Sequence, residues 1–236
     1  MGFRGVTVNL SSIFVAAALV LSGAGLPVLA QSNCGSLQNH YGPFDYRIER
    51  DKAFQVEKHH FNAGVESLQR GQSGANIAGD IEYLLRVFPN HHRGLNSLMR
   101  LGLKIRSEYL EGLAYSVECY FERALRFQPQ DAIVRMLYAN YLVVHKRPSE
   151  AMQQLEVAIG LAADNPFTHF NIGLIYMDLK DYPHALVQAH RAMELGFTKQ
   201  DLKERLVVAG QWVEPKSPLS PTNAPAASAP VATSSQ

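Results

Sequence analysis

Two pairs of adjacent histidines are the residues whose types best suit metal chemistry: His59, His60, His91 and His92. A zinc site needs three or four convergent ligands. Because adjacent residues on a helix point about 100° apart, each pair can offer only one ligand to a given centre. One histidine from each pair would then have to meet a carboxylate from Glu57, Glu66 or Asp80. No ligand-spacing motif indicates such a site. The alternative is that His92 begins a helix and that the ring nitrogens bond to loop carbonyl groups, so we expect no metal and no other cofactor.

The short motifs that position a nucleophile or a phosphate are absent from the sequence. It contains no GxSxG, HExxH, GxxxxGK or GxGxxG pattern. The glycines at positions 71, 74 and 79 stand among Ser and Asn residues, which suits a turn. Catalytic groups can assemble from distant residues, but nothing here indicates them, and we expect a protein that is not an enzyme.

The sequence holds two cysteines, Cys34 and Cys119, and no CxxC pair that would support redox catalysis. In an oxidising compartment the two can form a disulfide. Closing so long a loop would contribute about 4 to 5 kcal/mol in the chain-entropy model. Alternatively, Cys119 stands inside a helical pattern, where a free cysteine is a small buried hydrophobe. The sequence leaves both interpretations open.

The first thirty residues differ in kind from the rest. Arg4 is their only charged residue, an apolar run from Ile13 to Leu21 follows, and small or apolar residues precede Gln31. This is typical of a secretory signal peptide over residues 1–30, cleaved after Ala30. The alternative is a membrane anchor, but Ser, Gly and Pro residues leave the apolar run shorter than the ~20 residues of a spanning helix. We expect a periplasmic or secreted protein without a stable membrane span after cleavage.

Charge excludes one class of partner. The 22 basic and 21 acidic residues nearly balance, whereas a nucleic-acid-binding protein would show a basic surplus or stripe. Residues 214–236 consist mainly of Pro, Ala, Ser and Thr without an aromatic residue. Such a composition buries too little apolar surface to offset the ordering entropy, and we expect a disordered tail. The folded part should run from about Tyr41 to Val213.

The elements that would position any site are set by an internal repeat. Residues 165–196 align with residues 131–162 at a shift of 34. Each segment has the pattern of two apolar-periodic helices joined by a short polar turn, with Pro148 or Pro183 at the start of the second helix. The shift superposes small or apolar residues on one another: Gly173 on Ala139, Tyr176 on Leu142, Ala185 on Ala151, Ala189 on Leu155 and Ala192 on Ala158. Small residues let two antiparallel helices approach closely, while a larger neighbour fills the remaining space.

This spacing resembles the tetratricopeptide repeat (TPR) family, whose period is 34 residues. Gly173, Tyr176, Ala185 and Ala192 stand at four of its signature positions. The sequence departs from the family at its early Trp, which is His169 here, and at its late aromatic, which is Ala189. The resemblance covers roughly residues 75–210 and implies a stack of helix pairs.

Upstream of residue 131 the pattern loosens. The stretch FERALRFQP at 121–129 matches the end of another repeat, whose first helix would be about Asn90–Arg106 with a longer joining loop. Ile81–Pro89 again ends like a second helix, and its partner would be about Asp51–Arg70. At the far end, Lys199–Gly210 predicts a capping helix with Thr198 as its N-cap. We expect an all-α fold, an α-solenoid of about four TPR-like helix pairs plus a capping helix. Its parts are a strap at 31–50, divergent pairs at 51–130, two repeats at 131–197 and the cap at 198–213.

The segment from Cys34 to Asp80 does not fit the repeat. Its aromatic stretch contains Tyr41, Phe44 and Tyr46. These residues would either form a lid across the concave surface or cap the first helix pair, and caps are the commoner solution because a terminal repeat otherwise exposes its apolar face.

The family resemblance implies a partner-binding groove lined by the first helix of each pair. It assigns these residues to the groove: Ile133, Met136, Asn140, Val143, Phe167, Phe170, Asn171, Leu174 and Met177. Asn140 and Asn171 have the 31-residue offset at which peptide-binding members hold a ligand's backbone or terminal carboxylate. The lysine of those members is replaced by Met136, which favours an apolar peptide or helix. The alternative is that some of these residues only pack against neighbouring helices.

Two functions of different class follow. The first is an exported protein–protein interaction scaffold that binds a peptide or helix in this groove. The second is a periplasmic protein that binds a metal or small ligand through the His-rich N-terminal region.

Overall fold

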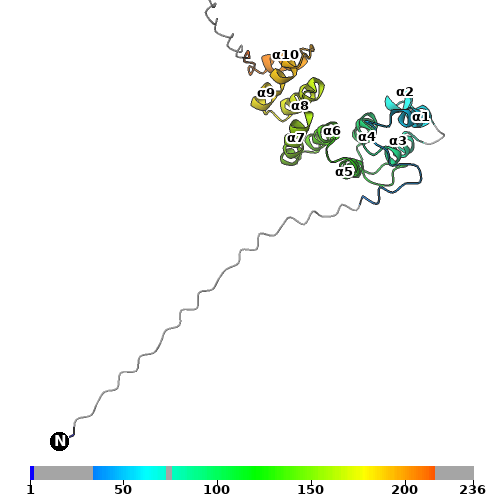
Figure 1. Cartoon of the computed structure of the whole chain (residues 1–236), viewed down its shortest axis with the longest axis horizontal. Coiled ribbons are helices and arrows are strands. Elements are labelled where there is room, and N and C mark those ends of the chain that lie inside the picture. Colours follow the sequence, from blue (N-terminus) through cyan, green and yellow to red (C-terminus); the bar gives the residue numbers. More distant parts are fainter. Residues whose placement is uncertain (3–33, 73–75, 216–236) are drawn as a thin grey trace, which may run out of the picture. The chain divides into compact units, whose positions relative to one another are not determined.

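The computed structural model describes residues 1, 2, 34–72 and 76–215, and these residues form helices and loops without a strand (Figure 1). The expected signal peptide and nearly all of the expected tail lie outside them. The described helices are α1 (Arg50–His60), α2 (Ala63–Glu66), α3 (Ile77–Val87), α4 (His92–Ile105), α5 (Val117–Phe127), α6 (Ala132–Val144), α7 (Pro148–Ala162), α8 (Pro166–Asp178), α9 (Tyr182–Glu194) and α10 (Asp201–Val208). None of these helices has the length and apolar character needed to cross a membrane. The all-helical prediction is confirmed.

Two successive helix pairs repeat the same local structure. Helices α6 and α8 begin 34 residues apart, at Ala132 and Pro166, and α7 and α9 begin 34 residues apart, at Pro148 and Tyr182. Each first helix ends at a lysine with left-handed backbone, Lys146 at φ 61° and Lys180 at φ 60°. The amides at and after these lysines bond back to the last turn of the helix, which is how many helices end.

Small residues bring the paired helices together, as their spacing predicts. Ala139, Ala151 and Ala158 are fully buried between α6 and α7. Gly173 of α8 is buried in the same way, and a Cβ atom there would meet Leu202 of α10 and Gln188 of α9. The large neighbour that fills the space beside the glycine therefore comes from α10.

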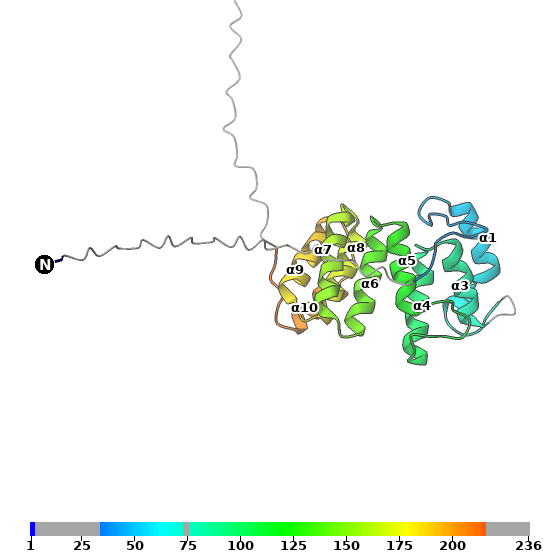
Figure 2. The same ribbon diagram turned by 90° about the horizontal axis from the view of Figure 1, so that it is seen from below.

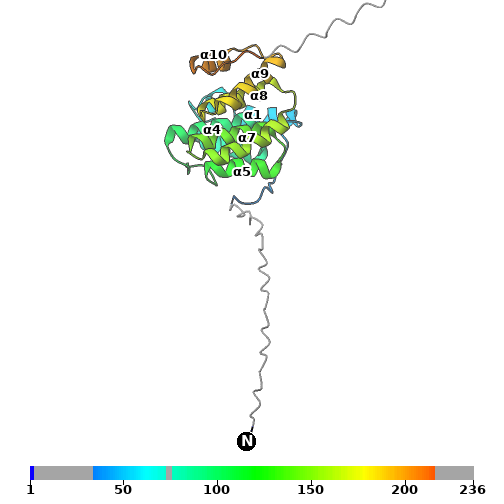
Figure 3. The same ribbon diagram turned by 90° about the vertical axis from the view of Figure 1, so that its left-hand side faces the viewer.

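The helices follow one another along the described part of the chain, from α1 at one end to α9 and α10 at the other (Figure 2). One cluster of buried apolar side chains runs from Tyr46 to Leu206. Helix α10 packs against both α8 and α9 (Figure 3). This helix is shorter than expected, and the prediction of Thr198 as its N-cap is wrong. The cap residue is Gln200, whose side chain makes no capping hydrogen bond.

The N-terminal helices differ from the expected pair. A single helix over Asp51–Arg70 was expected, but α1 ends at His60 and the short α2 begins at Ala63. Asn62 causes the break, because its side-chain oxygen accepts hydrogen bonds from the amides of Gly64 and Val65 and so starts a new helix. The helix expected over Asn90–Arg106 corresponds to α4, and the loop from 106 to 116 that follows it is long, as expected.

The N-terminal strap is covalently fixed to α5. Cys34 and Cys119 form a disulfide across 85 residues of sequence, which decides between the two interpretations of these cysteines. Beside it, the buried guanidinium of Arg123 donates to the backbone oxygens of Cys34 and Ser36 at 2.7 and 2.8 Å. Arg126 donates to the oxygen of Gly35 at 2.8 Å. The strap thus begins as a bonded segment on the surface of α5.

From α5 the strap runs to the turn between α3 and α4. The Phe44 amide donates to the Val87 oxygen, and the Phe44 ring packs 5.7 Å from that of Phe88. Tyr46 is buried, with its ring 4.0 Å from the ring of His91. These contacts agree with the cap on the first helices rather than with a lid.

Candidate functional site

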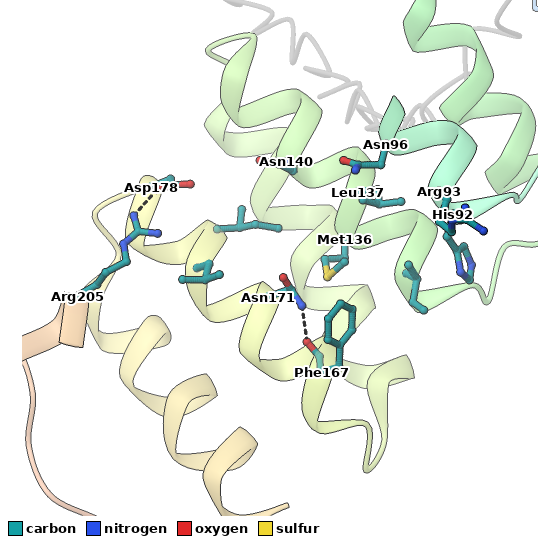
Figure 4. A pocket seen from close by; sticks show the side chains of 13 residues that line it. His92, Arg93, Asn96, Met136, Leu137, Asn140, Phe167, Asn171, Asp178 and Arg205 are labelled. Carbon is teal, nitrogen blue, oxygen red and sulfur yellow. Dashed lines mark hydrogen bonds and ion pairs between the residues drawn. The ribbon is translucent and has the colours of Figure 1, made fainter. Parts of the chain in front are cut away.

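The candidate site is a groove formed by α4, α6 and α8 and closed at one end by α10 (Figure 4). Its volume is about 480 Å³. Helix α4 contributes one edge, α6 and α8 contribute the floor, and one arginine comes from α10. The lining residues are His92, Arg93, Asn96, Ile133, Met136, Leu137, Asn140, Phe167, Asn171, Leu174, Ile175, Asp178 and Arg205.

Helical periodicity explains this lining. Residues three, four and seven apart share one face of a helix, and Ile133, Met136 and Asn140 have this spacing on α6. Phe167, Asn171 and Leu174 repeat it on α8. The floor is therefore apolar, and the Phe167 side chain stands at its edge with 52% of the residue exposed.

Six of the nine residues expected in the groove line it: Ile133, Met136, Asn140, Phe167, Asn171 and Leu174. The other three, Val143, Phe170 and Met177, do not. Phe170 is 7% exposed and its ring lies 4.5 Å from that of Phe197, in the packing between α8 and the segment before α10. Met177 is also buried, and Val143 packs against the core. Each follows a lining residue by three positions, and on a helix this turns the side chain about 60° away from the groove.

Three asparagines reach the groove, one from each of three neighbouring helices: Asn96 of α4, Asn140 of α6 and Asn171 of α8 (Figure 4). The Asn171 amide donates to the Phe167 oxygen of its own helix at 2.7 Å. That of Asn140 makes only a long contact of 3.9 Å to the Met99 sulfur. Among the described residues, no group bonds to the Asn96 side chain or to the amide oxygens of Asn140 and Asn171. These polar atoms are available to a ligand.

Charged side chains stand at the two ends of the groove and are paired with each other or with neighbours. Arg205 donates to Asp178 at 2.6 Å, joining α10 to α8. At the opposite end Arg93 pairs with Glu66 and lies 3.4 Å from Glu57. The hydrogen bond to Glu66 raises the pKa of Arg93, so this guanidinium stays charged. The middle of the groove holds no charged residue, which suits an uncharged ligand.

A buried polar network supports the α4 and α6 side of the groove. Asp131 caps α6 by accepting from the amides of Ile133 and Val134. The same carboxylate bonds to His92 at 2.9 Å and accepts from Asn90 at 3.0 Å. Burial opposes ionisation of Asp131, but these hydrogen bonds outweigh it and hold the pKa of the carboxyl below its usual value. One ionised group therefore links the starts of α4 and α6.

The strap joins this network. Asp45 bonds to Asn90 at 2.8 Å and to Arg47 at 2.7 Å, and the Arg47 guanidinium lies 3.6 Å from Asp131. Its hydrogen bond from Arg47 lowers the pKa of Asp45 to about 2. The strap therefore supports the groove from behind without lining it.

The four histidines considered as metal ligands are spread over separate contacts. His60 lies 3.1 Å from Asp80, His91 lies 2.8 Å from Glu57, and His59 is exposed. The ring nitrogens thus bond to carboxylates rather than to the loop carbonyls that we expected. In the part of the chain that the structure describes, no group of three or more possible ligands includes a histidine. The one such group is Cys34, Cys119 and Glu122, and its two sulfurs are joined in the disulfide.

His91 has a defined structural role. Its Nδ1 accepts from the amide of Gly94, so the proton of the neutral ring is on Nε2, which faces Glu57. Complete burial lowers the pKa of His91 and favours this neutral form. The histidine is the N-cap of α4.

Several lining residues were not foreseen from the sequence. Leu137, Ile175 and Asp178 follow from the helical spacing of their neighbours. Asn96 was missed because 44 residues, rather than 34, separate it from Asn140. Arg205 could not be found without knowing that α10 packs back on α8.

Comparison of the chain with known protein families finds no family that matches, and comparison with curated proteins finds no matching protein.

Proposed function

We propose that this chain is an exported scaffold of TPR type that binds an extended, largely uncharged peptide segment of a partner protein in the groove of α4, α6 and α8. The observation that carries the proposal is the set of three asparagines, one on each of these helices, with side-chain groups available at the groove. The protein acts by binding and not by catalysis.

The solenoid interpretation is supported by the repeated pairs. Helices α6 with α7 and α8 with α9 share their 34-residue offset, their small buried residues and their left-handed lysine ends. Helices α4 and α5 form a third, looser unit, and α3 precedes them. A stack needs several units and atypical ends, and the strap and α10 would serve as these ends.

The peptide interpretation follows from the chemistry of the carboxamide group. An asparagine side chain offers both a donor and an acceptor, as a peptide backbone does. Neighbouring packed helices lie about 8 to 10 Å apart, and an extended chain rises about 3.3 Å per residue. Successive asparagines would therefore meet every third residue of a bound strand. The apolar floor of Met136, Leu137 and Leu174 would receive its side chains.

Export is supported by the disulfide, because such bonds form and persist in oxidising compartments. The residues that carry the expected signal peptide precede Cys34. A periplasmic or secreted location is therefore part of the proposal.

Selection of peptides from a random library on the disulfide-bonded protein tests the function. Two matched variants sort the result: Leu174→Glu puts a charge in the groove, and Met152→Glu puts the same charge on an exposed site of α7, where 36% of the methionine is accessible. The proposal predicts uncharged or weakly charged peptides whose binding is lost with Leu174→Glu and kept with Met152→Glu. Peptides that bind both variants equally, or no enriched peptide at all, would contradict it.

A further inference from the structure

The chain leaves the described residues beside the helix that closes the groove. The carboxylate of Glu214 accepts from Lys203 of α10 at 3.2 Å and from the Trp212 ring at 2.9 Å. Lys203 precedes Arg205 by two residues, and Arg205 lines the groove. Less than one helical turn therefore separates the contact that holds residue 214 from the groove wall.

The sequence that follows is long enough to cross the groove. Residues 216–236 comprise 21 residues, which can extend to about 70 Å. Crossing from α8 over α6 to α4 requires about 20 Å at the usual spacing of packed helices. About six or seven residues would span it, and the rest would reach from residue 214 to its start.

The chemistry of this segment matches the groove. Its only charged residue is Lys216, at its start, and its larger apolar side chains are Leu219 and Val231. An uncharged strand loses little charge solvation when it enters a groove whose central residues are apolar or asparagine. Four prolines between 217 and 231 favour an extended backbone, which reduces the entropy lost on binding.

We propose that the segment from Ser217 to Val231 of the same chain occupies the groove as an internal ligand that a partner's peptide must displace. This inference rests on the proposed function of the groove. A tethered segment has an effective concentration of about 1 mM. If its own Kd is about 1 mM, it fills the groove about half of the time and lowers the apparent affinity for an external peptide about two-fold; a Kd of about 0.1 mM lowers it about ten-fold.

A spin label on the segment in the full chain tests the proposal. Both natural cysteines are bonded to each other, so Ser228→Cys supplies a single thiol for a nitroxide. The methyl signals of Met136, in the groove, and Met152, on the outer face of α7, are then compared with the label oxidised and reduced. We expect the Met136 signal to lose more than half of its intensity and the Met152 signal to keep most of it. Replacing Leu219 and Val231 by serine in the same segment should restore Met136 without touching the folded helices.

Three results would overturn the inference: equal effects at both methionines, no change with the serine replacements, or a Met136 effect seen only between labelled and unlabelled molecules, which would make a second copy the occupant. Titration with a library-selected peptide separates this failure from failure of the function. If the label has no effect but the peptide shifts the Met136 signal, the internal ligand is wrong and the groove function stands. If the peptide leaves Met136 unchanged, the groove function is wrong.

Discussion

Removing the Cys34–Cys119 disulfide should lower the stability of this protein substantially. The bond closes a loop across 85 residues of sequence, and in the chain-entropy model a loop of this length stabilises the fold by about 4 to 5 kcal/mol. For a folded part of this size, each kcal/mol changes the midpoint of thermal unfolding by about 2 to 4 °C. The double variant Cys34→Ser, Cys119→Ser should therefore unfold about 10 to 18 °C below the wild type.

The structure also predicts where the change is felt. Without the bond, the strap is held to α5 by the hydrogen bonds of Arg123 and Arg126 alone. Each such bond to a charged donor contributes about 1.5 to 3 kcal/mol at most. The backbone amides of the strap, including that of Phe44, should exchange with solvent faster, whereas those of α8 and α9 should change only as global stability changes.

Thermal melts followed by circular dichroism, with and without a thiol reductant, measure this effect. The wild type should lose stability when reduced, and the double serine variant should be insensitive to the reductant. A midpoint that falls by less than about 3 °C, or a reductant effect of the same size in the serine variant, would refute the reasoning.

Acid and core substitutions provide further tests. In the unfolded chain His91 takes up a proton near its ordinary pKa of 6.5, whereas burial lowers that pKa in the fold. The unfolded state then binds more protons, and stability should fall from about pH 6.5 downward until the folded pKa is reached. Melts at pH 7.5 and 5.5 should show a smaller loss for His91→Asn, which keeps a capping oxygen; an unchanged loss would contradict this. Asp45 adds a second loss as the pH falls from 3.8 through about 2, because ionisation of this carboxyl supports its contacts with Arg47 and Asn90. Gly173→Leu should lower the free energy of unfolding by about 1 to 3 kcal/mol through its clash with Leu202, whereas Gly160→Leu, at a glycine with no atom within 4 Å, should raise it slightly. Denaturant titration of both variants checks the pair, and equal changes would exclude the packing argument.

The best-predicted part of the fold is the part whose information is local. Over residues 131–196 the 34-residue repeat, the prolines and the small residues predict two helix pairs, and α6 to α9 agree with them. The break at Asn62 was missed because its capping bonds compete with a helix that the apolar pattern also allows.

The course of the strap could not be predicted, because it depends on partners far away in the sequence. Cys34 meets Cys119, and Asp45 meets Asn90, across distances along the chain that no periodicity records. The site was predicted in part for the same reason. Six expected residues line the groove because their spacing follows the helix, while Asn96 and Arg205 belong to it through tertiary packing. Phe170 had the right residue type and helix but faces the packing beneath the groove.

The most direct test of the central claim measures whether Asn140 bonds to the backbone of a bound peptide. The dissociation constant of a library-selected peptide is measured for the wild type and Asn140→Ala, each with the natural peptide and with versions N-methylated at one backbone nitrogen at a time. Loss of one hydrogen bond should weaken binding by about 2- to 10-fold. At one peptide position, methylation should weaken binding to the wild type by this factor and have little further effect on Asn140→Ala. If every methylated peptide loses the same affinity for both proteins, and Asn140→Ala itself binds like the wild type, the asparagines do not hold a peptide backbone and the proposed function is wrong.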